Sequence, residues 1–365
     1  MPEIDRKAPN MADCPTGNCG VQILTREQKR QTFTYDPANP REAWQDFRWR
    51  ILNFSQGYIE HTWDFSFVEE GLHDLWDELI HVAKRHPADS AEHDRLVTLI
   101  LQARECGPVT RKAKDTSVDE EPEEVFLPNG QRLWIDLPYL VQEFQDVSMK
   151  ESMGYTAAQW EGLVALTARL CAIGVYPSEL GRCALPLTRV EGEENASNAC
   201  VPVVELLPAC LAWLKYKSFK LATFTATNHV YPPPSAGDSV QDSTAPGDIA
   251  PKSEFPCSGF SIARWVFWGR RYKHFYHCGN EQIAKLARAC FEAAVFKGMR
   301  MGIELPGEKI FLTRAHNNRY PASRNIHSSF SNYFLRVPLK VTNLSEIGNR
   351  YQYQRTVSFC SSSVY

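Results

Sequence analysis

The sequence predicts an all-α fold, an irregular helical bundle of about eight helices with flexible termini. Apolar residues recur at helical spacing in successive segments between residues 40 and 302. Of the 365 residues, 43% are hydrophobic, which is enough apolar material for a sizeable core. With 23% charged residues and a net charge of −3, the composition argues against wholesale disorder.

The first three helices are predicted between residues 40 and 103. Pro40 begins the first of them, because proline is tolerated in a first helical turn. The clearest helix spans residues 66–85, and Pro87 ends it because the residue before a proline leaves helical geometry. Asp89 is predicted to begin the next helix, and the short connection makes the pair an antiparallel hairpin.

The middle of the chain is expected to hold a loop and two more helices. Residues 107–124 carry a run of charges and predict an exposed loop. Asp136 is a candidate N-cap for the helix that follows it. The helix over 157–174 is apolar nearly all round, which is typical of the middle of a bundle. We expect Trp76 and Trp160, each on an apolar stripe, to be buried.

The last three helices are separated by a long loop. A helix is predicted from about Pro202, and Pro208 is expected to kink it. Residues 230–256 are rich in Pro, Ser, Asp and Gly and predict a loop. Helices over 260–277 and 281–301 follow.

These patterns divide the chain into three parts. Residues 1–39 are expected to form a flexible N-terminal segment, and residues 40–302 the helical domain with its loop at 230–256. Residues 303–365 are expected to form a basic tail rich in Ser and Asn. Both ends lack the periodic apolar faces that offset the entropy of ordering.

The sequence also predicts a compartment. It shows neither a secretory signal at the N-terminus nor the 18 or more apolar residues that span a bilayer. We therefore expect a cytoplasmic protein without a membrane partner, with the nucleus as the alternative. The eleven cysteines are then expected to be free, buried thiols.

Several short segments stand in a fixed order along the chain: Leu75–Asp77, Ala83–Lys84, His86–Pro87, Asp94–Val97, Trp134–Pro138, Gln159–Trp160, Ala168–Leu170 and Trp265–Trp268. In this order they resemble a fungal family known as domain of unknown function 3632. The resemblance covers roughly residues 65–302. It implies a helical, intracellular protein, and it carries over no activity, cofactor or catalytic residue.

One predicted helix carries residue types that bind metals. His73, Asp77 and His81 follow one another at intervals of four residues, and Glu70 and Glu78 each stand three residues before a histidine. Such ligands can hold zinc or iron, but di-iron sites take them from two facing helices. These residues lie opposite the apolar stripe, so we interpret them as a solvated polar face.

Two further groups have metal-type side chains without a second pair nearby. They are His274 with His277 and Cys278, and Cys14 with Cys19. We therefore expect no metal and no cofactor.

The helix over 260–277 combines aromatic and basic residues. Aromatic side chains with interleaved cations can stack on single-stranded bases and follow phosphates. The alternative, which we favour, is that the aromatic residues belong to the core. The candidate anion-binding residues are Arg264, Arg270, Arg271 and Lys273.

Charge is distributed unevenly along the chain. Residues 257–365 hold 16 Lys and Arg against 5 Asp and Glu, a net of +11, whereas residues 1–256 carry a net of −14. We expect the two parts to compensate each other, and we expect no nucleic-acid partner at physiological salt.

The common fingerprints of hydrolases, nucleotide-binding enzymes and zinc proteases are missing from the sequence. The leading hypothesis is therefore a non-enzymatic helical interaction or scaffold protein with a protein partner. One alternative is an enzyme that acts on a small fungal metabolite in a pocket between helices, where His93 is the candidate pocket residue. Another is weak polyanion binding through the basic C-terminal part.

Overall fold

The structure, a computed structural model, describes residues 28, 33, 35–37, 39–60, 65–111, 123–149, 155–185, 203–232, 244–247, 258–305 and 308. The predicted all-α class is confirmed. The described residues form ten helices rather than about eight: α2 (Arg41–Ile59), α3 (Phe65–Lys84), α4 (Ala91–Glu105), α5 (Leu140–Met149), α6 (Ala157–Ala172), α7 (Pro177–Gly181), α9 (Val203–Tyr216), α10 (Ser218–Ala226), α11 (Ile262–Tyr276) and α12 (Glu281–Arg300). The two helices that periodicity did not predict are the short ones, α7 and α10.

Polar side chains fix where several of these helices begin. The N-cap of α4 is Ser90 rather than Asp89, and its hydroxyl accepts a hydrogen bond from the backbone N–H of Glu92 at 3.2 Å. Thr156 and Gln159 form a reciprocal capping box at the start of α6. Ser261 and Asn280 cap α11 and α12 with a single bond each, in which the side-chain oxygen accepts from a backbone N–H.

The start of α5 differs from the prediction. Asp136 does not cap a helix, because its carboxylate accepts hydrogen bonds from the backbone N–H and the guanidinium of Arg132, at 2.8 and 2.9 Å. Leu137 and Tyr139 then adopt positive φ angles of 40° and 65°, which a right-handed helix does not allow. The helix therefore begins only at Leu140.

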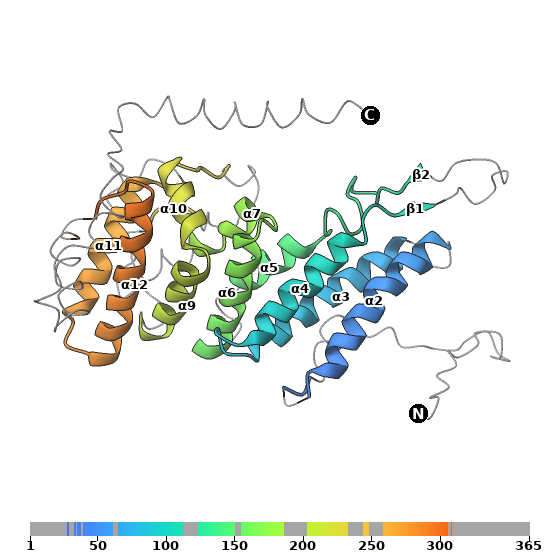
Figure 1. Cartoon of the computed structure of the whole chain (residues 1–365), viewed down its shortest axis with the longest axis horizontal. Helices are drawn as coiled ribbons and strands as arrows, with labels where there is room; N and C mark the ends of the chain where they lie inside the picture. Colours follow the sequence, from blue (N-terminus) through green and yellow to red (C-terminus); the bar gives the residue numbers. More distant parts are fainter. Residues whose placement is uncertain are drawn as a thin grey trace, which may run out of the picture. The chain divides into compact units, whose positions relative to one another are not determined.

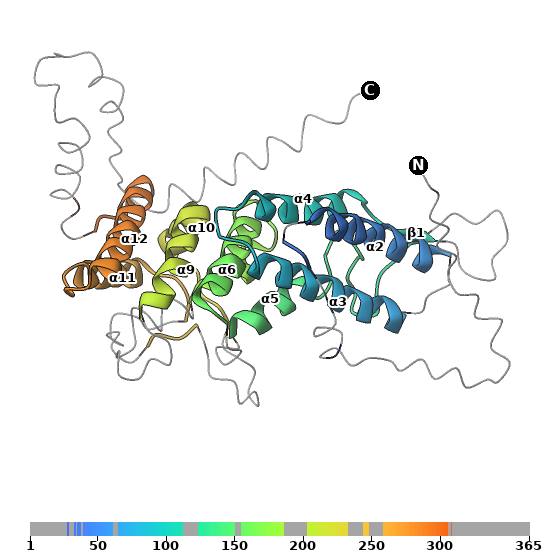
Figure 2. The same cartoon turned by 90° about the horizontal axis from the view of Figure 1, so that it is seen from below.

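Helix α6 lies in the middle of the assembly, as its all-round apolar character predicted. It contacts α3 and α4 on one side and α9 on the other, and Figures 1 and 2 show this order from two directions. Gly162 permits the close approach to α3. A Cβ atom on Gly162 would lie 2.5 Å from the carbonyl oxygen of Ala83 and 2.6 Å from that of His86.

The two tryptophans predicted to be buried behave differently. Trp76 is 1% exposed, and its indole N–H donates to the carbonyl oxygen of Pro138 at 2.8 Å. Trp160 is only half-buried, so that prediction was wrong. It lies in the first turn of α6, where its ring stacks on Tyr155 with the ring centroids 6.2 Å apart.

The predicted loop over 107–124 contains a short ladder at its base. Strands β1 (Thr110–Arg111) and β2 (Glu123–Glu124) pair antiparallel, and residues 112–122 lie outside the described part. Helix α9 continues through Pro208. Four described thiols are free and buried, whereas Cys106 and Cys278 are free and exposed.

Three segments were expected to be irregular: residues 1–39, the loop at 230–256 and residues 303–365. Most of each segment lies outside the described residues. Where their ends are described, Tyr35, Ile303 and Leu305 are buried against the helices. No described helix is long and apolar enough to cross a membrane.

Candidate functional site

The aromatic residues of α11 belong to the core. Trp265, Trp268, Tyr272 and Phe275 are each at most 7% exposed, and Tyr276 is the exception at 44%. Their burial agrees with the interpretation that the sequence favoured. An aromatic platform for stacked bases does not form at the surface here.

The four candidate anion-binding cations are not brought together. Arg264 is 1% exposed, and its guanidinium donates to the carbonyl oxygens of Thr244 and Gly259, both at 2.8 Å. It lies in the interior rather than on the predicted surface. Arg270 and Lys273 are exposed, and Arg271 is half-buried with its guanidinium 4.9 Å from the centroid of the Phe275 ring.

The polar face of α3 is less solvated than predicted, because Glu70 is exposed whereas the other four candidate residues are half-buried. Nδ1 of His73 lies 2.6 Å from a carboxylate oxygen of Glu143, which is itself buried in α5. Glu78 pairs with Arg50 of α2 at 2.9 Å. Burial lowers the pKa of His81 to about 4.

These contacts bind helices to one another rather than to a metal. Across the described ranges, no three His, Cys, Asp or Glu side chains come together as a metal site. His274, His277 and Cys278 are exposed at the end of α11, and Cys14 and Cys19 lie outside the described residues.

His93 is buried completely in α4. Its Nε2 donates to the carbonyl oxygen of Pro87 at 3.0 Å, so the ring ties the helix to the turn before it. Burial, with the charge of Arg169 as a second cause, lowers its pKa to about 4. His93 is therefore placed as a neutral core histidine rather than as a pocket wall.

An apolar cavity lies between α9, α10, α11 and α12. Its volume is about 10 Å³, which is room for about one water molecule. Its lining includes Cys210, Trp213, Leu221 and Trp268 and is almost entirely apolar. A cavity of this size holds no metabolite.

The sequence reasoning missed a buried lysine at the junction of α9 and α10. Lys217 is 1% exposed, and its Nζ donates to the carbonyl oxygen of Pro177, the first residue of α7, at 2.8 Å. Nζ also lies 5.4 and 4.9 Å from the ring centroids of Trp213 and Phe224. The signal for it was present, since Trp213, Lys217 and Leu221 share one helical stripe at intervals of four.

Burial disfavours a positive charge on Lys217, whereas the faces of the Trp213 and Phe224 rings attract one. Among the described residues, no carboxylate pairs with Nζ, and the carbonyl of Pro177 is its one hydrogen-bond partner. Burial lowers the pKa of Lys217 to about 6, and the charge of Lys220 acts in the same direction. The amine is therefore mostly neutral at pH 7.

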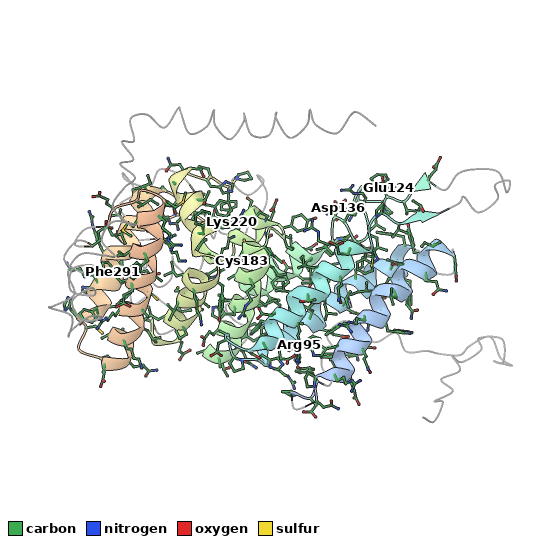
Figure 3. The ribbon with its side chains drawn as sticks, viewed as in Figure 1. Arg95, Glu124, Asp136, Cys183, Lys220 and Phe291 are labelled. Atoms are coloured by element: carbon green, nitrogen blue, oxygen red, sulfur yellow. The ribbon has the colours of Figure 1, made fainter. Side chains whose placement is uncertain are left out.

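Other polar groups gather around this amine. The Tyr231 hydroxyl donates to the carbonyl oxygen of Ser178 at 2.8 Å, and the Ser178 hydroxyl lies 2.9 Å from Nε2 of the half-buried His229. Gly181 permits this close packing, because a Cβ there would lie 2.8 Å from Nζ of Lys217 and 3.3 Å from the Tyr231 hydroxyl. Figure 3 marks the region by Cys183, which follows α7, and Lys220, which lies on α10. We call Lys217, Ser178, His229 and Tyr231 the amine cluster.

A second feature that the sequence reasoning missed is an exposed apolar stripe on α2. Its core face holds Trp44, Phe47, Ile51 and Phe54. On the side away from the core, Trp49 is 61%, Leu52 65% and Ile59 39% exposed. We call Trp49, Leu52 and Ile59 the α2 stripe.

The comparisons with known proteins give one family and one relative to report. The sequence pattern of a family described as "Protein of unknown function (DUF3632)" matches residues 76–272. "Oxopyrrolidines biosynthesis cluster protein G" of Penicillium oxalicum is 26% identical over 219 residues, which cover 56% of this chain and 59% of that protein. No solved structure matches.

Proposed function

The chain belongs to the family of proteins of unknown function DUF3632, and we propose that it is a non-enzymatic helical interaction protein that pairs with a second copy of itself through α2. The observation that carries the proposal is the α2 stripe. Two large apolar side chains one helical turn apart, Trp49 and Leu52, are each more than half exposed. Exposed apolar groups of this size, rimmed by polar residues, are typical of interaction sites.

The order of residues along this face favours a second copy as the partner. A symmetric dimer presents the same surface from both copies, so the surface must complement itself. A twofold axis that passes through α2 between Arg50 and Ile51 would place the two α2 helices antiparallel. Each residue would then face the residue that lies equally far on the other side of the axis. The exposed residues that would face each other are Arg41 with Glu60, Gln45 with Gln56, and Trp49 with Leu52. Arg41 meets Glu60 at the ends and apolar meets apolar at the centre, whereas Ile59 meets the acidic Glu42.

The size of the surface sets the expected strength of the pair. Helix α2 is about 30 Å long at 1.5 Å per residue. One helix pair of that length buries less than the ~1,200 Å² of stable assemblies. We therefore expect a reversible dimer whose population depends on concentration.

The relative in Penicillium oxalicum supports a place in biosynthesis. That protein is named for a biosynthesis cluster, and its name states no reaction. This chain spans about three fifths of its length. A role in organising proteins of a fungal biosynthetic pathway fits the name of that relative.

The proposal is tested by the mass of the purified chain as a function of concentration. We expect the average mass to rise towards that of a dimer, and Trp49→Glu to hold it at the monomer mass. Phe219→Glu is the matched control, because Phe219 of α10 is also exposed, at 56%, but lies outside the α2 stripe. A chain that stays monomeric at every concentration, or a Phe219 variant with the same effect, contradicts the proposal.

A second candidate function has its own observation. The buried neutral amine of Lys217 is a nucleophile of the kind that covalent chemistry uses. The alternative function is therefore an enzyme that acts on a small metabolite.

A further inference from the structure

We propose that the groove between the segment before α2 and the first half of α2 binds a small aliphatic diamine, a molecule with an ammonium group at each end of a short carbon chain. None of the residues of the α2 stripe lines this groove, and the site goes beyond the interaction role. The argument depends on four features of the groove: its size, its charge, the spacing of its carboxylates and its walls.

The groove has room for a metabolite. Its volume is about 500 Å³, which lies within the range of about 300–1,000 Å³ typical of small-molecule sites. The cavity between α9 and α12, by contrast, has about 10 Å³. The lining residues come from the segment before α2 and from the first three turns of that helix: Phe33, Tyr35, Asp36 and Asn39, and then Glu42, Ala43, Asp46 and Arg50.

The charges around the groove favour a cation. Asp36, Glu42 and Asp46 contribute carboxylates, and Arg50 is the cation among the lining residues. The guanidinium of Arg50 is already engaged, at 2.7 Å from Asp46 and at 2.9 Å from the half-buried Glu78 of α3. Negative charge is therefore in excess, so the groove attracts cations and repels anions.

The carboxylates are spread along the groove rather than gathered at one point. Glu42 and Asp46 stand four residues apart on α2, a rise of about 6 Å, and Asp36 comes from the segment before the helix. Within the described ranges no three metal-type side chains converge, here or elsewhere, so the arrangement does not suit a single metal ion. Two ammonium groups on a four-carbon chain lie about 6 Å apart and match this spacing.

The walls suit the body of such a ligand as well as its ends. Phe33 and Tyr35 contribute aromatic rings, whose faces attract cations and whose apolar surface packs against methylene groups. Asn39 adds an amide oxygen, which is a further acceptor for an ammonium N–H. Aliphatic amines have pKa values near that of a lysine side chain, about 10.4, so both ends of the ligand are charged at pH 7.

The segment before α2 is held in place without a ligand. The Tyr35 hydroxyl lies 2.5 Å from Nε2 of His86, and the Arg85 guanidinium donates to the Tyr35 carbonyl oxygen at 2.9 Å. The ring of Phe33 meets that of His81 edge-on, with the centroids 5.5 Å apart. Because these contacts already fix the wall, binding does not require the wall to become ordered first.

The test is isothermal titration calorimetry of the full chain with putrescine, the diamine with a four-carbon chain. Butylamine has the same chain and one ammonium group, so it is the control ligand. We expect putrescine to bind about two- to fivefold more tightly, because its second ammonium group meets a carboxylate of its own. A chain that gives no binding heat with millimolar putrescine, or that binds the two amines equally, would overturn the proposal.

Variants show whether the groove is the site. Asp36→Asn removes one charge at nearly constant size, and we expect it to weaken putrescine binding about two- to fivefold. Asp36→Asn combined with Glu42→Gln is expected to weaken it about tenfold. Asp146→Asn is the matched control, because Asp146 is exposed on α5 and does not line the groove. An equal loss in the Asp146 variant, or no loss in the Asp36 variant, would contradict a site in the groove.

Competition with salts separates a diamine site from a metal site. Magnesium chloride and sodium chloride are compared at equal ionic strength, where they screen charges to a similar extent. We expect them to weaken putrescine binding equally, because the spread carboxylates offer Mg²⁺ no octahedral set of ligands. Magnesium that displaces putrescine much more strongly than sodium does would show that the carboxylates gather around a metal ion, and this result would overturn the proposal.

Discussion

Three buried basic side chains in this molecule are held by backbone carbonyl groups. Arg264 donates to Thr244 and Gly259, His93 to Pro87, and Lys217 to Pro177. The bonds of Arg264 and His93 tie α11 and α4 to the loops and turns before them, and the bond of Lys217 ties the junction of α9 and α10 to the start of α7. The sequence alone could not predict these contacts, because the carbonyl partners are set by how the loops pack rather than by residue type.

The first prediction at the residue scale concerns Lys217→Met. The folded-state pKa of Lys217 is about 6 and its ordinary value is 10.5, so between these values the unfolded chain binds a proton that the folded chain lacks. Stability that depends on Lys217 therefore rises with pH in this window, by about 1.4 kcal/mol per pH unit. Methionine removes this dependence, and the Pro177 carbonyl keeps the Cys171 thiol as a donor at 2.9 Å.

We therefore expect Lys217→Met to stabilise the protein relative to wild type at pH 7 and to lose about 3 kcal/mol of that advantage by pH 9. Urea midpoints at the two pH values measure it. The conservative Lys217→Arg is the control that keeps a cation, and we expect it to destabilise at both values. A difference between the methionine variant and wild type that stays constant with pH would refute the assignment of a neutral amine.

The second prediction concerns His93. Its folded-state pKa is about 4 against an ordinary 6.5, so the unfolded chain takes up a proton first as the pH falls through this window. Wild type should lose on the order of 2 kcal/mol between pH 7 and pH 5 on account of His93. His93→Asn keeps an N–H donor but does not titrate. Between pH 7 and pH 5 its free energy of unfolding should therefore fall by about 2 kcal/mol less than that of wild type. Denaturation midpoints at pH 7 and pH 5 measure this difference. The control is His277→Asn at the exposed end of α11, which should lose as much stability as wild type.

At the scale of elements, hydrophobic periodicity predicted the long helices well. The apolar stripes of α3, α6, α11 and α12 located those helices to within a few residues of their ends. The missed helices were α7, with five residues, and α10, which follows α9 directly. The predicted start of α5 was wrong because Leu137 and Tyr139, just before the helix, have positive φ angles. The sequence pattern does not show such angles.

The prediction at this scale concerns the approach of α6 to α3. Gly162→Ala places a methyl group within 2.6 Å of two backbone carbonyl oxygens, so one of the helices must shift. We expect a loss of about 1–3 kcal/mol, the usual range for overpacking. Gly298→Ala in α12 is the matched control, because its Cβ would meet its nearest neighbours at 3.1 Å and should cost less. Thermal or urea unfolding measures both, and equal effects would contradict the packing argument.

At the scale of the whole molecule, the sequence predicted the class but neither candidate surface. The α2 stripe escaped notice because Trp49 and Leu52 look like ordinary helical apolar residues until the neighbours of α2 are known. The candidate site residues were drawn from residue types that suggest chemistry, and the fold turned Arg264 and His93 inwards. What a side chain does here depends on which face its helix presents, and tertiary contacts decide that.

The charge pattern of the α2 surface offers the most direct test of self-association. Arg41→Glu would place two acidic groups opposite each other at both ends of the symmetric pair, and Glu60→Arg would do the same with two cations. Exposed ion pairs contribute up to about 1 kcal/mol each, so each single reversal should weaken the dimer by about tenfold or more. The double variant exchanges the charges and restores both pairs.

Sedimentation equilibrium of wild type, the two single variants and the double variant measures this in one experiment. The account predicts a concentration-dependent dimer for wild type, a shift towards monomer for each single variant, and recovery of the dimer for Arg41→Glu combined with Glu60→Arg. A wild-type chain that stays monomeric, or a double variant that remains as weak as the single ones, would contradict the antiparallel pairing of α2.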